Sequence, residues 1–249
     1  MARPDTRGPM PPEPAEDETT RLRRVYGAYA ADDATRARWD PEQPGNRLIL
    51  AERDALLRRA LEGTGLTGPS GVLVDLGCGD GRVLASVAAD RVAIGIDLLE
   101  SRLRTARAAQ PGALLVAANG AALPLASGTV DLMVVFTVFS SILDRTVQHD
   151  VATEIRRVVR PGGRVVWYDL RRDNPRNAEV RGWSAPDVAR LFPGWSVDLR
   201  SCTVLPPLAR QAARVSPRSY AVLGRVPALR SHLFGVLTSP TAQPEMESA

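Results

Sequence analysis

The sequence predicts an α/β protein with a doubly wound, mostly parallel seven-stranded sheet, N-terminal helices and a helical insert before the last strand. Three observations predict this class. Short apolar runs of strand length alternate with helical segments through the middle of the chain. A glycine-rich turn directly follows the first of these runs. The chain has 249 residues, 44% of them hydrophobic, which is enough for the core of one such domain.

The N-terminal part precedes the strand pattern. Its first 19 residues are rich in proline and acid and lack apolar periodicity, so we expect them to be disordered. A helix is expected from Arg21 to about Ala30. After the proline-broken stretch "RWDPEQPGN", we expect Asn46 to cap a second helix that ends at Gly63.

The middle of the chain alternates strands and helices, as crossover units of a parallel sheet do. Five strands are expected, at 71–76, 92–97, 113–118, 129–136 and 164–170. The helix before the fifth strand shows one apolar stripe, formed by Leu143, Val147, Val151, Ile155 and Val158, and "PGG" at 161–163 ends it. Ligands of such a sheet bind beyond the carboxyl ends of its strands.

The C-terminal part has a different pattern. We expect a helix with Pro186 in its first turn, and strands at 195–204 and 232–238. Between these strands, 205–230 reads as two short helices that carry several arginines and no acid. Solvated helix faces are the favoured interpretation of these arginines, and a cover that attracts an anionic ligand is the alternative.

Composition excludes several classes of protein. The formal charge is only +4 although all 32 basic residues are arginine, which indicates coding bias more than nucleic-acid binding. The two cysteines, Cys78 and Cys202, make neither a disulfide framework nor a metal cluster. The N-terminus has no apolar signal segment, and no apolar run reaches the roughly 20 residues of a membrane span. We therefore expect a cytoplasmic protein.

The turn "DLGCGDG", Asp75 to Gly81, decides which ligand the sheet binds. A dinucleotide fingerprint needs a third glycine where Arg82 stands, and a phosphate-cradling loop needs a lysine, which the chain lacks. The carboxylate of Asp75 suits an amine and repels pyrophosphate. Asp97 closes the second strand, where a carboxylate accepts hydrogen bonds from ribose hydroxyls. Together these residues predict an adenosyl ligand with a cationic group.

Four segments in register resemble motifs of the class I S-adenosylmethionine-dependent methyltransferases: "VLVDLGCGDGR", "GIDLLE", "AANGAALPLASGTVDLMVV" and "EIRRVVRPGGRVVWYDLR". The resemblance runs from about Arg21 to the C-terminus and is strongest to small single-domain members from gene clusters for polysaccharides or specialised metabolites. It implies a Rossmann-like fold, S-adenosylmethionine as cofactor with S-adenosylhomocysteine as product, and no metal. The implied organisation is a disordered tail at 1–19, a helical lid at 20–65, a cofactor-binding catalytic domain at 66–240 with its insert at 205–230, and a disordered tail at 241–249.

The resemblance also implies the residues that hold the cofactor. These are Asp75 for the amino group, Gly77, Cys78 and Gly79 for a close backbone approach, Asp97 for the ribose, Leu98, Asn119 and Gly120 for the adenine, and Phe136 and Thr137 beside the methionine moiety. Asn119 stands where the family commonly has an Asp. Because an amide oxygen can still accept a hydrogen bond, we expect only a modest effect on affinity.

The catalytic group depends on the acceptor, because a hydroxyl needs a base and a carboxylate needs none. Asp169, at the end of the fifth strand, is the preferred base, with an ion pair to Arg171 or Arg172 as the alternative. His149 is the second candidate, although its polar neighbours favour an ordinary surface histidine. His232, at the start of the last strand, is expected to be structural.

Polar residues near the expected mouth of the site are candidates for acceptor binding, with helix capping and turn formation as the alternatives. They are Asn46, Arg47, Tyr168, Arg172, Asn174 and Asn177.

The sequence therefore predicts a methyltransferase acting on a small molecule, at a hydroxyl or carboxylate oxygen of a sugar or specialised metabolite. The alternatives are N- or C-methylation of a natural product, methylation of RNA or protein, and a donor-binding scaffold without activity. "FTVFSS" after the fourth strand lacks the motif of enzymes that methylate amino groups of nucleic acids, so we expect no nucleic-acid partner. A monomer or homodimer is expected.

Overall fold

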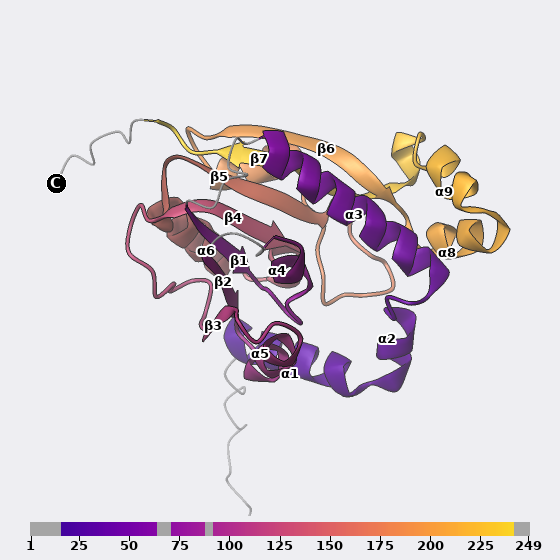
Figure 1. Cartoon of the computed structure of the whole chain (residues 1–249), viewed down its shortest axis with the longest axis horizontal. Helices are drawn as coiled ribbons and strands as arrows, with labels where there is room; N and C mark the ends of the chain where they lie inside the picture. Colours follow the sequence, from indigo (N-terminus) through magenta and orange to yellow (C-terminus); the bar gives the residue numbers. More distant parts are fainter. Residues whose placement is uncertain (1–15, 64–70, 88–91, 242–249) are drawn as a thin grey trace, which may run out of the picture.

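The computed structural model of the protein describes residues 16–63, 71–87 and 92–241 (Figure 1). Most of the two tails expected at 1–19 and 241–249 lies outside these residues. No helix of the described segments is both long and apolar enough to cross a membrane.

One seven-stranded sheet forms the centre of the molecule, with the order β3-β2-β1-β4-β5-β7-β6. The strands are β1 (Val72–Leu76), β2 (Val92–Asp97), β3 (Leu114–Ala117), β4 (Val130–Phe136), β5 (Val159–Leu170), β6 (Ser196–Val204) and β7 (Arg230–Thr238). All neighbouring pairs are parallel except those that β7 makes with β5 and β6. The expected doubly wound, mostly parallel sheet is confirmed, and the chain reverses its strand order between β1 and β4.

Helices cover both faces of the sheet. They are α1 (Glu18–Ala31), α2 (Asp33–Arg38), α3 (Pro44–Gly63), α4 (Arg82–Val87), α5 (Glu100–Ala109), α6 (Arg145–Val158), α7 (Ala185–Leu191), α8 (Pro206–Val215) and α9 (Pro217–Leu223). The apolar stripe of α6 packs with α7 on one face, where Ile155, Val188 and Trp167 are fully buried. On the other face, α3, α4 and α5 bury residues such as Leu57 and Leu84. The core thus lies on both sides of the strands, as the continuous apolar runs predict.

Two local expectations were wrong. Helix α3 begins at Pro44, so Asn46 is inside its first turn and does not cap it. The amide of Asn46 instead donates to the carbonyls of Arg38 and Asp40, and it ties α3 to the end of the short helix α2. Strand β5 begins at Val159 and includes "PGG", because Val159 pairs with Val130 before a register shift.

The insert at 205–230 folds as the two short helices that the sequence predicts, α8 and α9. They pack beside the first half of α3 and lie away from the core of the sheet (Figure 1). The contact is close: a Cβ on Gly45 would be 2.6 Å from the Cα of Arg210, so only glycine fits there. This contact closes one side of the space beyond β5 and β7.

Candidate functional site

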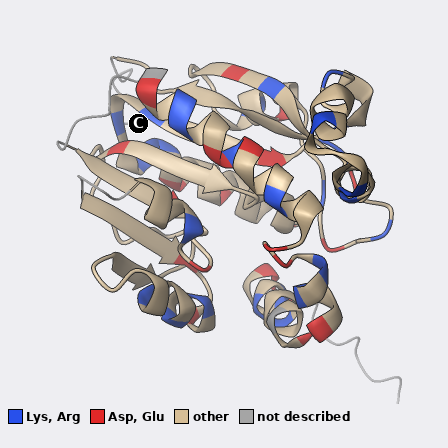
Figure 2. Cartoon of the chain, turned by 45° about the vertical axis from the view of Figure 1, so that its right-hand side comes forward, with Lys and Arg blue, Asp and Glu red and all other residues tan. Residues whose placement is uncertain are grey.

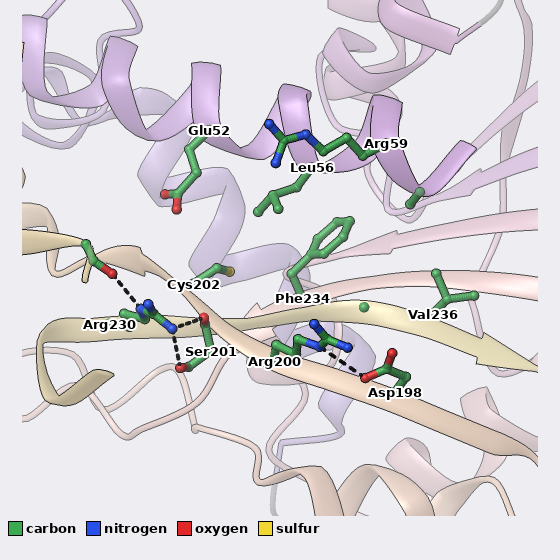
Figure 3. Close-up of a pocket in the computed structure, with 13 residues that line it drawn as sticks. Glu52, Leu56, Arg59, Asp198, Arg200, Ser201, Cys202, Arg230, Phe234 and Val236 are labelled. Carbon is green, nitrogen blue, oxygen red and sulfur yellow. Dashed lines mark hydrogen bonds and ion pairs between the residues drawn. The ribbon is translucent and has the colours of Figure 1, made fainter. Parts of the chain in front are cut away.

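Two cavities among the described residues are large enough to consider as ligand sites. The larger, of about 1470 Å³, lies beyond the carboxyl ends of the parallel strands and is closed by α1, α2 and the loop at 171–184. The smaller, of about 560 Å³, lies between α3 and the β6–β7 hairpin, with Leu56 and Phe234 in its wall (Figure 3). Because ligands of open α/β sheets bind at the carboxyl ends near the reversal of strand order, the larger cavity is the candidate site.

The glycine turn forms the floor of the cavity beside β1. Gly77 and Gly79 have φ of +74° and +55°, which side chains other than glycine rarely adopt. A Cβ on Gly77 would also lie 2.7 Å from a methyl group of Val138. The amides of Gly77 and Cys78 both donate to the carbonyl of Ile96, which fixes the turn against the end of β2.

Asp97 is the best positioned of the predicted residues. It lines the cavity, is 7% exposed, and accepts one backbone hydrogen bond on each carboxylate oxygen, from Gly79 and from Leu99, both at 2.9 Å. Each oxygen keeps a lone pair for a further donor. Its carboxylate is therefore held rigidly with accepting capacity for a pair of hydroxyls.

Asp75 lies just behind the cavity and not on its surface. The side chain is 1% exposed and its Oδ2 has no hydrogen-bond partner among the described residues. Burial raises the pKa of Asp75 to about 7, and the charge of Arg53 opposes that rise. An uncompensated buried carboxyl group of this kind is suited to pair with a cationic group that enters next to it.

The other predicted cofactor residues divide between cavity and core. Leu98, Asn119, Gly120, Phe136 and Thr137 all line the cavity. Cys78 does not: its buried side chain packs among the α3–α4–α5 core, and burial raises the pKa of its thiol. Only the backbone of Cys78 belongs to the turn.

The side chain of Asn119 makes its hydrogen bonds to other residues of the chain. Its Oδ1 accepts from the amide of Ala121 at 3.0 Å, and its Nδ2 donates to Thr19 of α1 at 3.3 Å. The residue therefore links the end of β3 to the helix that covers this part of the cavity.

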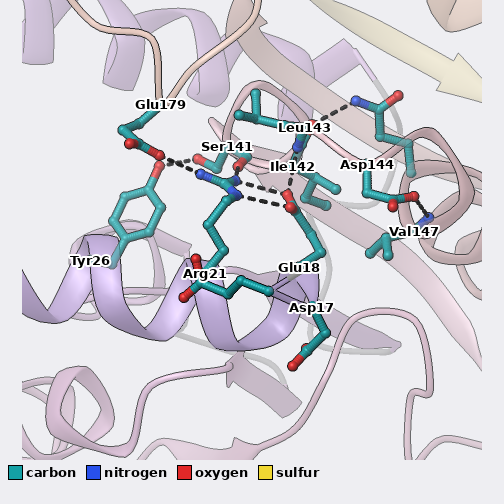
Figure 4. A network of polar contacts seen from close by, with 12 residues as sticks. Asp17, Glu18, Arg21, Tyr26, Ser141, Ile142, Leu143, Asp144, Val147 and Glu179 are labelled. Atoms are coloured by element: carbon teal, nitrogen blue, oxygen red, sulfur yellow. Dashed lines mark hydrogen bonds and ion pairs between the residues drawn. The ribbon is translucent and has the colours of Figure 1, made fainter. Parts of the chain in front are cut away.

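A polar network fastens α1 over the site (Figure 4). Arg21 donates to both oxygens of Glu18, to Glu179 at 2.6 Å and to the carbonyl of Ser141 at 2.5 Å. Glu18 accepts from the amide of Leu143, and the hydroxyls of Tyr26 and Ser141 are hydrogen-bonded. One half-buried arginine thus joins α1, the turn after β4 and the loop at 171–184.

The predicted acceptor-binding residues also divide. Asn46, Tyr168, Arg172, Asn174 and Asn177 line the cavity, and the last two additionally hold turns of the loop at 171–184. Arg47 lies outside the lining, with an exposed side chain that pairs with Glu42.

Neither predicted base reaches the cavity. Asp169 is fully buried, and its Oδ2 accepts from the amide of Ser140, so it anchors the turn after β4. Burial raises its pKa to about 6, against the lowering effect of its hydrogen bonds to Ser140. His149 is on the exposed face of α6 and outside the lining. These positions give no geometric support for a base at Asp169 or at His149.

The structure places a different titratable residue in the cavity wall, His232, which the sequence predicts to be structural. His232 lines the cavity at the start of β7 and stacks on Tyr168, with 4.5 Å between ring centroids and 8° between ring planes. Burial lowers its pKa to about 3, so the imidazole is neutral. No local motif marks His232, because its neighbours in space come from β5 and β6.

The residues present fit an adenosyl sulfonium ligand. Asp97 could accept from the ribose hydroxyls, the carboxyl of Asp75 with its unpartnered oxygen lies behind the glycine turn, and apolar Leu98 and Ile96 line the cavity where an adenine could pack. No group of three or more His, Cys, Asp or Glu with metal-binding geometry occurs among the described residues.

Comparison with known proteins supports the same class. Residues 74–167 match a protein-family model described as a methyltransferase domain. A protein-lysine N-methyltransferase of Saccharolobus islandicus is 26% identical over 150 residues, 57% of this chain and 83% of that protein.

Two solved structures share the fold. The N-methyltransferase NodS of Bradyrhizobium japonicum, in complex with S-adenosyl-L-homocysteine, is 19% identical with a TM-score of 0.63, over 90% of this chain and 100% of that one. The cyclase SpnF is 16% identical with a TM-score of 0.57, over 76% and 82%. At these identities, the structures establish the fold and not the reaction.

Proposed function

We propose that the chain, an S-adenosylmethionine-dependent methyltransferase by its fold and by the methyltransferase-domain match at 74–167, methylates an oxygen, a hydroxyl or a carboxylate, of a small molecule such as a sugar or specialised metabolite. The observation that carries the proposal is the size and shape of the cavity. Its 1470 Å³ exceed the roughly 300–1,000 Å³ of a typical single-ligand site. The cavity extends from Asp97 at the end of β2 to His232 at the start of β7, which leaves room for an acceptor beyond the cofactor.

We assign the cofactor to the β1–β2–β4 end of this cavity. Asp97 would accept from the ribose hydroxyls, Asp75 would attract the amino group, and Phe136 and Thr137 would border the methionine moiety. When bound, S-adenosylmethionine supplies an electrophilic methyl group on a sulfonium. The task left to the protein is to align the acceptor and to exclude water.

Enclosure by α1, α2 and the loop at 171–184 favours a small acceptor. Thr19, Tyr26 and Tyr29 of α1 form part of the lining, so the cavity is roofed by the chain itself. Charges of both signs are interspersed on the helices around the sheet (Figure 2), which is not the single-sign surface that nucleic-acid binding requires. A cytoplasmic monomer or homodimer without a nucleic-acid partner remains our prediction.

Protein lysine is the second candidate acceptor. It is favoured by the name of the Saccharolobus relative, whose match covers just over half of this chain. An N- or C-methylated natural product is a further alternative within the same chemistry. Each of these candidate acceptors requires the same cofactor site, and the candidates differ in the acceptor that would bind at the β5–β7 end of the cavity.

Isothermal titration with S-adenosylhomocysteine tests the proposal. We expect the full-length chain to bind it and Asp97→Ala to weaken binding by more than about 100-fold, because two charge-assisted hydrogen bonds of about 1.5–3 kcal/mol each are lost. Asp150→Ala is the matched control, since Asp150 is exposed on α6 and outside the cavity. Unchanged affinity in Asp97→Ala would overturn the site assignment. Transfer of tritiated methyl to poly-lysine, and not to small hydroxyl or carboxyl compounds, would favour the second candidate.

A further inference from the structure

The β5–β7 end of the cavity contains a histidine whose ring is held by a stacking contact and by a hydrogen bond. Tyr168 stacks on its face, and Leu170 is its neighbour in the sheet register. Its Nδ1 is 2.8 Å from the hydroxyl oxygen of Ser231, and both residues line the cavity. A ring held in this way has a defined direction for each of its nitrogens.

The hydrogen bonds of Ser231 determine which nitrogen of His232 carries the proton. The hydroxyl of Ser231 donates to the carbonyl of Thr203 at 3.0 Å, and a carbonyl can only accept. The single hydroxyl proton is thereby used, so the contact with Nδ1 requires Nδ1 to donate. The neutral imidazole then has its lone pair on Nε2.

Nε2 is free to meet a ligand. This nitrogen has no hydrogen-bond partner among the described residues. It is also not one of the fully buried atoms without a partner, so part of its surface is accessible. Because His232 lines the cavity, the accessible nitrogen faces that space.

Thr203, whose carbonyl accepts from Ser231, has a strained backbone conformation. It has φ of +60°, which is rare for a β-branched residue, and it is 1% exposed. Its hydroxyl accepts from Tyr168 at 3.1 Å, and its amide donates to Glu52 of α3 at 3.3 Å. Strain that the surrounding hydrogen bonds maintain is typical of functional sites.

A second atom that only accepts hydrogen bonds lies buried beside the cavity. Asn46 is 4% exposed and uses both amide hydrogens on the carbonyls of Arg38 and Asp40, at 2.8 and 2.9 Å. Its Oδ1 is buried and has no hydrogen-bond partner in the part of the chain that the structure describes. Nε2 of His232, a neutral atom that only accepts hydrogen bonds and is accessible from the cavity, favours a ligand that donates.

We propose that Nε2 of His232 is the general base of the methyl transfer and that the accepting group is a neutral hydroxyl rather than a carboxylate. The inference rests on the proposed function and narrows it. The acceptor oxygen forms a bond to the methyl carbon while the carbon–sulfur bond breaks with its electron pair passing to sulfur. The hydroxyl proton moves to Nε2, so one positive charge passes from sulfonium to imidazolium, which later releases the proton to solvent.

The chemistry of the two groups supports this assignment. A hydroxyl that is being alkylated becomes far more acidic than an imidazolium, so even a weakly basic imidazole can take its proton. A carboxylate has no proton to donate, and its lone pairs would face the lone pair of Nε2.

Nitrogen NMR of the full-length chain with labelled histidine tests the state of His232 without any acceptor. The chain has two histidines, so His149→Gln assigns the signals. At pH 7 we expect His232 to show a protonated Nδ1 and an unprotonated Nε2. Ser231→Ala should shift the ring towards the Nε2-protonated tautomer because Nδ1 loses its acceptor. Protonation on Nε2 in the unmodified chain would overturn the inference.

Activity measurements test the chemical role. Tritiated methyl transfer to pools of hexoses, phenols and alcohols is compared with transfer to matched carboxylic acids. We expect hydroxyl compounds to be methylated, and His232→Phe, which keeps the stacking on Tyr168, to lower kcat by about 100-fold or more while S-adenosylhomocysteine affinity stays within about twofold.

Each result separates the inference from the proposed function. Wild-type turnover in His232→Phe, or transfer to carboxylic acids alone, contradicts the inference and leaves the proposed function intact. If His232→Phe no longer binds S-adenosylhomocysteine, Ser231→Ala takes its place in the activity test. A kcat below wild type in Ser231→Ala then supports the inference, and a wild-type kcat contradicts it. Failure of the unmodified chain to bind S-adenosylhomocysteine contradicts the proposed function, and the NMR tautomer still decides the state of His232.

Discussion

The two ends of the cavity are built in different ways. The cofactor end, beyond β1, β2 and β4, comes mainly from the stretch between the glycine turn and Thr137, with α1 packed over it. The acceptor end comes from four distant segments: the start of α3, the end of β5, the end of β6 and the start of β7. The cofactor end is therefore built largely by consecutive strands and the turns that follow them, and the acceptor end by contacts between remote parts of the chain.

The same difference appears in the two threonines with left-handed backbone conformation. These are the only residues other than glycine with positive φ in the segments that the structure describes. Thr137 follows β4 directly, and its amide donates to the carbonyl of Tyr168 on the adjacent strand. Thr203 depends on α3, β5 and β7 together. A substitution at the acceptor end should therefore disturb more elements than one at the cofactor end.

The largest effect is expected at the cofactor end, from Asp75→Asn. The pKa of Asp75 rises from its ordinary 3.8 to about 7 on burial, so the wild-type protein loses stability as pH rises between these values, by up to about 4 kcal/mol. The amide does not titrate. In urea unfolding, the stability of the variant relative to wild type should therefore increase from pH 4 to pH 8.

Asp169, whose pKa is also raised by burial, contributes equally to both proteins and drops out of this comparison. Asp150→Asn, an exposed change on α6, should show no such trend. If the stability difference between Asp75→Asn and wild type does not change with pH, the prediction is contradicted. Ionisation of Asp75 would then not destabilise the folded protein.

An intermediate effect is expected at the acceptor end, from Glu52→Gln. Glu52 accepts from the hydroxyl of Tyr220 on α9 at 2.5 Å and from the amide of Thr203. The neutral amide keeps one accepting oxygen for Thr203 and can only donate to the hydroxyl of Tyr220, so two charge-assisted hydrogen bonds become neutral ones, at a cost of about 2 kcal/mol in unfolding free energy. S-adenosylhomocysteine affinity should stay within about twofold, because the cofactor end does not share these contacts.

Glu62→Gln, an exposed change at the other end of α3, is the control for stability. Loss of S-adenosylhomocysteine binding in Glu52→Gln would show that the two ends are not independent.

The smallest effect is expected from Arg21→Gln, which loosens α1 over the cofactor end. The variant loses the ion pairs with Glu18 and Glu179. We expect S-adenosylhomocysteine to bind about tenfold more weakly, or about 1.4 kcal/mol, as measured by titration. Arg24, on the same helix, makes an exposed ion pair with Glu16. Arg24→Gln removes that pair and should change S-adenosylhomocysteine affinity less than twofold. Equal affinities in the two variants would mean that α1 does not contribute to cofactor binding.

Local chemistry made most of the fold predictable. The seven strands and the two helices of the insert lie close to their expected positions, because apolar runs, helical stripes and prolines act over a few residues. The starts of α3 and β5 were predicted wrongly, because both depend on partners elsewhere. Asn46 binds carbonyls at the end of α2, and Val159 pairs with Val130.

The sequence by itself determined the sheet, the glycine turn and the identity of Asp75 and Asp97, since apolar runs, glycines and acids at strand ends can be recognised from the residues next to them. Only the tertiary structure decided which polar groups face the cavity. It buried Asp169 under the turn after β4, left His149 on the surface, and brought Ser231, Thr203 and Tyr168 around His232. The proton position of that histidine depends on a carbonyl nearly thirty residues away, and no local pattern contains such a contact.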